Sequence, residues 1–104
     1  MPKPVAYIAG PYRGPGPYDI LQNIRKAEHY ALKYWSLGYA VICPHKNTAM
    51  MDGALPDHVW LEGSMELLRR ADVVVMLPGW ESSDGSCAER KEAYRLDKQV
   101  VYED

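Results

Sequence analysis

The chain has 104 residues, of which 47% are hydrophobic and 25% charged, and its formal net charge is −2. This length suits a single domain over residues 1–104, and the slight acidity argues against a nucleic-acid partner, which usually requires a basic excess. No apolar run approaches the roughly 20 residues of a membrane span, so no membrane partner is expected. Cys43 and Cys87 show no metal-ligand spacing and fit a reducing environment, which predicts a cytoplasmic protein without a metal.

Apolar runs that end at breaker residues predict four strands, and apolar positions at helical spacing predict three helices between them. The strands are expected at Val5–Ala9, Tyr39–Cys43, Asp72–Leu77 and Gln99–Tyr102. The helices are expected from an Asp19 cap to Trp35 with Gly38 beyond the end, from Asp57 or His58 to Leu68, and from about Ser86 to Leu96. Residues 46–56 show no period and are expected to form a loop, which at this length is often a binding segment.

The alternation of strands and helices predicts an α/β fold, a small flavodoxin- or Rossmann-like three-layer sandwich. Its four-stranded parallel sheet is expected in the order 2-1-3-4, with helices on both faces. In this order the loops after the first and third strands face each other across a crevice. Arg13 lies in the first of these loops, Ser83 to Glu89 in the other, and His45 follows the second strand. We therefore expect these polar groups to converge.

The segment from Gly85 to Glu89 supports two interpretations. Ser86 and Glu89 fit a capping box, in which the serine bonds an amide of the first turn and the glutamate bonds the cap amide. Alternatively, Glu89 is a nucleophile or base beside the amide donors of a helix start. A carboxylate tied into a cap would be a poor nucleophile.

The other candidate residues also allow a binding role or an ordinary one. Arg13 can bind a phosphate through its planar donor fork, or it can be an exposed loop residue. His45 can be a catalyst or a loop histidine, and Tyr7, on a buried strand, is a core residue by default. An anion nest is a further possibility, although small polar residues beside glycine are typical of any loop. Its members would be Ser82, Ser83 and Ser86 with the amides of Asp84 and Gly85.

Four spaced motifs resemble the nucleoside 2-deoxyribosyltransferase-like superfamily over nearly the whole chain. They are YIAGPYRG at residues 7–14, PH at 44–45, ADVVV at 71–75 and SDGSCAE at 83–89. The last is similar to S-x-G-x-x-x-E, whose glutamate is the family nucleophile. The chain looks closest to a small branch, much of it in phages and bacteria, that is similar to deoxynucleoside 5′-monophosphate N-glycosidases.

The resemblance implies a cofactor-free reaction on a small-molecule nucleotide. Glu89 would attack C1′ as the base leaves, and water would release a sugar phosphate from the glycosyl-enzyme. Tyr7 would position Glu89 through its hydroxyl. The serine at position 83 favours a 5′-monophosphate, because transferases of free nucleosides tend to carry an acid there. The substrate-binding residues would be Gly10, Arg13, Gly14, His45, Ser83, Asp84, Gly85 and Ser86.

One position departs from the resemblance and leaves alternatives open. Relatives usually carry an aspartate where Ser64 stands. Either a second acid would then come from Glu62, Asp84, His45 or a carboxylate of another subunit, or turnover would be slow. Relatives complete their sites across a dimer, so a homodimer or a larger homo-oligomer is expected. The alternatives to hydrolysis are a nucleoside 2-deoxyribosyltransferase and a non-catalytic nucleotide-binding or sensing module.

Overall fold

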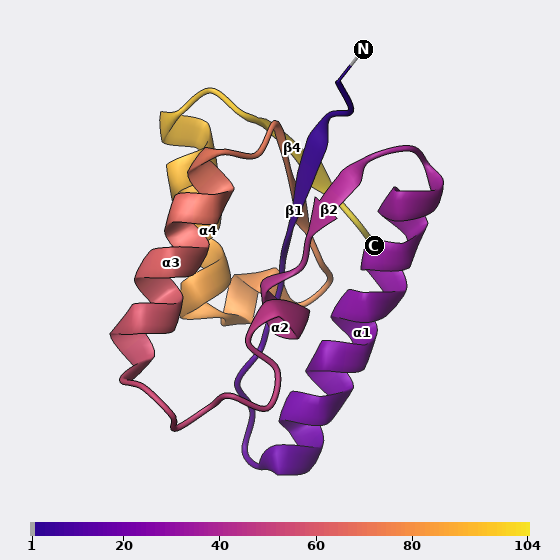
Figure 1. Cartoon of the computed structure of the whole chain (residues 1–104). Coiled ribbons are helices and arrows are strands. Elements are labelled where there is room, and N and C mark those ends of the chain that lie inside the picture. The colour runs from indigo at the N-terminus through magenta and orange to yellow at the C-terminus, as the bar shows by residue number, and fades with distance from the viewer. Residues whose placement is uncertain (1) are drawn as a thin grey trace.

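The computed structural model describes residues 2–104, which form an α/β fold around one all-parallel sheet (Figure 1). The sheet order is β2-β1-β3-β4, which confirms the predicted fold class and strand order. The strands are β1 (Val5–Ala9), β2 (Ala40–Ile42), β3 (Val73–Met76) and β4 (Gln99–Tyr102). The helices are α1 (Pro17–Ser36), α2 (Pro44–Asn47), α3 (Asp57–Arg69) and α4 (Asp84–Arg95), with a 3-10 turn at Trp80–Ser82 before α4.

The alternation of side chains along the central strands divides the core into two halves. Ala6 and Ile8 of β1 face α1, whereas Tyr7 and Ala9 face α3 and α4. In Figure 1, α1 accordingly lies on one side of the sheet and α3 and α4 on the other. Ala9 pairs with Met76 at the last position of both strands, so β1 and β3 end level at the same edge of the sheet. Their following loops therefore begin side by side.

The first helix begins earlier than the sequence indicated. Gly16 is its N-cap and Pro17 its first residue, a position that suits the fixed φ of proline. Asp19, predicted as the cap, instead lies in the first turn and accepts a hydrogen bond from the Gly16 amide at 3.1 Å. The predicted end is confirmed, because Gly38 adopts a φ of 98°, the left-handed conformation that a residue after a helix often takes.

The segment after β2 contains a short helix that the sequence analysis missed. Pro44 occupies the first turn of α2, which has four residues, so the loop itself runs only from 48 to 56. A single turn is too short to show a hydrophobic period, and the proline that opens it resembles a strand terminator. The consequence for the site is that His45 sits on a helix rather than on a loop.

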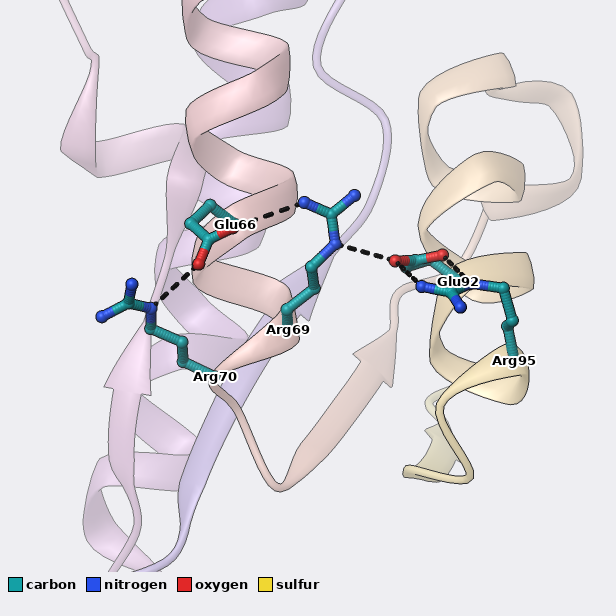
Figure 2. Close-up of polar contacts among 5 residues, drawn as sticks. All are labelled: Glu66, Arg69, Arg70, Glu92 and Arg95. Carbon is teal, nitrogen blue, oxygen red and sulfur yellow. Dashed lines mark hydrogen bonds and ion pairs between the residues drawn. The ribbon is translucent and has the colours of Figure 1, made fainter.

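A network of ion pairs joins α3 to α4 (Figure 2). Glu92 on α4 accepts from Arg95 at 2.7 and 2.8 Å and from Arg69 of α3 at 2.8 Å. Arg69 also contacts Glu66, which in turn binds Arg70. The hydrogen bonds from the two guanidinium groups lower the pKa of Glu92 to about 2. This network ties the two helices that flank the crevice to each other.

Candidate active site

A cavity of about 790 Å³ opens at the carboxyl ends of β1 and β3, within the size range of small-molecule sites. It contains most of the residues that the sequence analysis selected. The predicted residues that line it are Gly10, Arg13, His45, Ser83, Asp84, Gly85, Ser86 and Glu89. Two predicted residues do not line it: Gly14 packs against Asp19, and Tyr7 lies fully buried in the sheet. The loop after β1, the 48–56 loop and the start of α4 thus meet as the strand order requires.

Glu89 lines the cavity and accepts a hydrogen bond on Oε2 from the buried hydroxyl of Tyr7, which does not itself line the cavity. Burial raises the pKa of Glu89 to about 7, and the hydrogen bond from Tyr7 acts in the opposite direction. Burial and the adjacent carboxylate raise the pKa of Tyr7 far above its ordinary value, while the Ser64 side chain lowers it. Tyr7 therefore remains a proton donor at every physiological pH, and Glu89 changes charge near neutrality.

The start of α4 disproves the capping-box interpretation of Glu89. Ser83 is the N-cap, and its Oγ accepts a hydrogen bond from the Ser86 amide at 3.2 Å. The cap therefore lies three residues before the predicted one, and Glu89 lies in the second turn of the helix, beyond the reach of the cap. The hydroxyl of Ser86 is buried and has no hydrogen-bond partner among the described residues. The cap uses the Ser86 amide, whereas the amides of Asp84 and Gly85 precede the first bond inside the helix, so this end of the cavity favours an anion.

Arg13 also lines the cavity and is held by two aspartates. Its guanidinium donates to both carboxylate oxygens of Asp52 at 2.9 and 3.0 Å and to Asp57 at 3.1 Å. The hydrogen bond to Asp52 raises the pKa of Arg13, and the same contact lowers the pKa of Asp52. Asn23 of α1 supports this loop by donating to the Tyr12 carbonyl at 3.0 Å. The sequence analysis did not select Asp52 or Asn23, and treated Asp57 only as a helix start.

His45 connects α2 to the loop after β1. Its Nε2 donates to the carbonyl of Pro11 at 2.9 Å, and its ring lies edge-on to Tyr12. Burial lowers the pKa of the imidazole, which stays neutral and has one nitrogen occupied. Its Nδ1 and the indole nitrogen of Trp60 are both buried without a partner among residues 2–104. The histidine therefore anchors the loop after β1 through Nε2, while its Nδ1 keeps an unshared lone pair.

The chain is an open parallel α/β domain that carries a carboxylate in the crevice between the loops after β1 and β3. The chain superposes on a 2-deoxyribosyltransferase from Leishmania mexicana with a TM-score of 0.70 and 17% identity. That match covers 97% of this chain and 63% of the other, so the chain spans less than two thirds of that relative. A 2-deoxyribosyltransferase from the psychrotolerant bacterium Bacillus psychrosaccharolyticus gives a TM-score of 0.67 and 21% identity, covering 94% and 70% of the two chains.

The family of the chain follows from its sequence. The chain belongs to the family described as Domain of unknown function (DUF4406), which matches residues 4–102. No curated protein matches the chain. At the identities of the two solved structures, the likeness establishes the deoxyribosyltransferase-like fold. Within the described residues, no helix has both the length and the apolar character needed to cross a membrane.

Proposed function

We propose that this protein hydrolyses the N-glycosidic bond of a (deoxy)nucleoside 5′-monophosphate, with Glu89 as the nucleophile. The observation that carries the proposal is that Glu89 lines the cavity while the buried hydroxyl of Tyr7 holds one of its carboxylate oxygens. Tyr7 holds Oε2, which leaves Oε1 available to a sugar. A half-buried carboxylate that is paired with a neutral donor is a good nucleophile, because part of its hydration is already removed before attack.

The reaction proceeds in two displacements. In the first, Oε1 of Glu89 bonds to C1′ while the bond from C1′ to the base nitrogen breaks and its electron pair leaves with the base, which takes up a proton. In the second, water attacks C1′ and gives up a proton to the group that protonated the base, Glu89 leaves as the carboxylate, and the sugar 5-phosphate is released. Of the groups considered for the second acid, Asp84 and His45 line the cavity and Glu62 does not; Asp84, as the carboxyl group of the two, is our candidate for the donor of the proton to the base.

The phosphate would bind at the start of α4, against the first-turn amides and the hydroxyl of Ser86. Arg13 would assist, although its guanidinium is engaged by Asp52 and Asp57. All three side chains are largely exposed, and ion pairs of that kind contribute little stability. A phosphate dianion can therefore exchange with one of the two carboxylates at small cost.

A nucleoside 2-deoxyribosyltransferase is the second candidate. The fold shared with two such enzymes favours it, as does the engagement of the Arg13 guanidinium by Asp52. In this reaction a second base, instead of water, would attack C1′ of the same Glu89 adduct.

The test is base release from a panel of ribo- and deoxyribonucleoside 5′-monophosphates and the matching nucleosides, with and without a second base. Glu89→Gln should abolish release, whereas Glu81→Gln, an exposed glutamate outside the cavity lining, should not change it. Release from monophosphates without an acceptor supports hydrolysis, and exchange that requires a second base supports the transferase. Binding of nucleotide without any release would refute both reactions and leave the non-catalytic sensing module.

Arg13→Ala separates the two substrate classes within the same assay. If Arg13 contacts the phosphate, the variant should raise KM for a monophosphate by about tenfold, the cost of one charge-assisted hydrogen bond, without affecting the nucleoside. An equal effect on both substrates would mean that Arg13 supports the loops through its two aspartates and does not touch the ligand.

A further inference from the structure

A stripe of exposed side chains runs along α1, away from the face that packs on the sheet. The sheet-facing side chains of this helix are Ala27, Ala31 and Tyr34, all buried. The large apolar side chains of the stripe are instead strongly exposed: Tyr18 71%, Leu21 44%, Leu32 63% and Trp35 54%. Between them lie the charged residues Arg25 and Glu28. So much exposed apolar area on one helix is unusual for an isolated domain and marks an interaction surface.

The spacing of the stripe is that of a helix-packing seam. Its six residues follow one another at alternating steps of three and four, the pattern that keeps one face of a helix against a partner helix. We call these residues the α1 stripe: Tyr18, Leu21, Arg25, Glu28, Leu32 and Trp35. The helix has 20 residues and so is about 30 Å long, enough for several layers of contact.

The order of residues in the α1 stripe reads the same from both ends. The sequence is aromatic, leucine, charge, charge, leucine, aromatic, and its midpoint falls between Arg25 and Glu28. A two-fold axis through that midpoint, perpendicular to the helix, would place Tyr18 of one copy against Trp35 of the other. Leu21 would meet Leu32, and each arginine would meet a glutamate. Such self-complementarity is the requirement of a symmetric dimer interface.

The two charged residues fix the direction of the partner helix. In a parallel pair Arg25 would face Arg25 and Glu28 would face Glu28, which is repulsive at both layers. In the antiparallel pair both layers are attractive. Arg25 forms no ion pair in the described part of the chain, and Glu28 has an exposed contact with Lys46 that leaves its other oxygen available. We propose that the α1 stripe is the interface of a homodimer in which two copies of α1 pack antiparallel.

The experiment measures the mass of the purified full chain by sedimentation and light scattering over a wide range of concentration. The wild type should be a dimer. Leu32→Ser should raise the dissociation constant by about 100-fold or more, because two buried leucines are lost per dimer. The matched control is Leu61→Ser on α3, which is 64% exposed and lies on the other side of the sheet, and it should leave the dimer intact.

A charge exchange tests the antiparallel register. Arg25→Glu alone sets two glutamates against each other in both charged layers and should weaken the dimer, and Glu28→Arg should do the same with arginines. The double variant Arg25→Glu/Glu28→Arg restores both attractions and should recover the dimer, with circular dichroism confirming that each variant is folded.

A monomeric wild type at all concentrations would overturn the proposal, as would a dimer that Leu32→Ser leaves intact and Leu61→Ser dissociates. A wild type that stays monomeric but sediments with lipid vesicles would assign the stripe to a membrane surface instead. Single charge variants that dimerise as well as the wild type would refute the antiparallel register.

Discussion

Replacing Glu89 with glutamine should make the protein more stable at neutral and alkaline pH. Burial raises the pKa of this carboxyl group from its ordinary value of 4.5 to about 7 in the folded state. Between those two pH values the unfolded chain releases the proton and the folded chain keeps it. The free energy of unfolding of the wild type therefore falls as the pH rises through this window, and stays at the lower level above it.

The size of the effect follows from the two pKa values. A difference of about 2.5 between them corresponds to roughly 3 kcal/mol, at 1.36 kcal/mol per pH unit. About 1 kcal/mol of this is already lost at about pH 5.5, and nearly all of it at about pH 8. Glutamine has a similar shape, cannot ionise and can still accept a hydrogen bond from Tyr7. The advantage of Glu89→Gln should therefore grow by about 2 kcal/mol between those two pH values.

Urea unfolding followed by circular dichroism at both pH values measures this difference. Glu81→Gln serves as the control for the general change of one surface charge. A Glu89→Gln variant that is less stable than the wild type by a similar amount at every pH would refute the reasoning, because it would assign the carboxylate an ordinary structural role. Greater stability combined with lost base release would instead identify Glu89 as a group held in the fold at a cost to stability.

Three other predictions follow from neighbouring contacts. Tyr7→Phe removes the hydrogen-bond donor that lowers the pKa of Glu89. The acidic limb of the pH–rate profile should therefore move up by about 1 to 2 pH units, and the rate at pH 7 should fall about 5- to 50-fold. An unchanged acidic limb would contradict this. Gly10→Ala places a Cβ 2.9 Å from that of Leu77 and should cost about 1–3 kcal/mol in urea unfolding, whereas Gly63→Ala, with open space around it, should be neutral or stabilising. Glu92→Gln should lower the thermal stability at pH 7. This loss of stability should diminish as the pH falls from 4.5 toward 2, where the wild-type carboxylate is itself protonated. A loss that does not depend on pH would exclude the ion pairs as its cause.

The fold could be predicted from the sequence because its strands are continuous apolar runs. A central parallel strand is covered on both faces, so β1 and β3 show no charged residue within them, and breakers mark their ends. Helix starts were harder to place. Serines at 82, 83 and 86 offer more than one cap in the same segment, and the choice of Ser83 depends on a hydrogen bond that local patterns do not specify.

The pairing of Arg13 shows what a single sequence cannot supply. Asp52 lies 39 residues away along the chain, in a loop without a period, and Asp57 looks like an ordinary helix-opening acid. The sequence indicated where Arg13 would be, since the strand order places its loop at the crevice. It held no signal that two carboxylates from a distant loop and helix would meet the guanidinium there.

The contact between Glu89 and Tyr7 depends on two independent features, the alternation of side chains along β1 and the residue at which α4 begins. The two-residue period of β1 turns Tyr7 toward α3 and α4, and the start of α4 at Ser83 determines which of its side chains face the sheet. A helix started one residue later would turn each side chain by about 100° relative to the start of the helix. The cap at Ser83 and the buried tyrosine therefore act together: the first sets the direction of the carboxylate, and the second provides the donor that receives it.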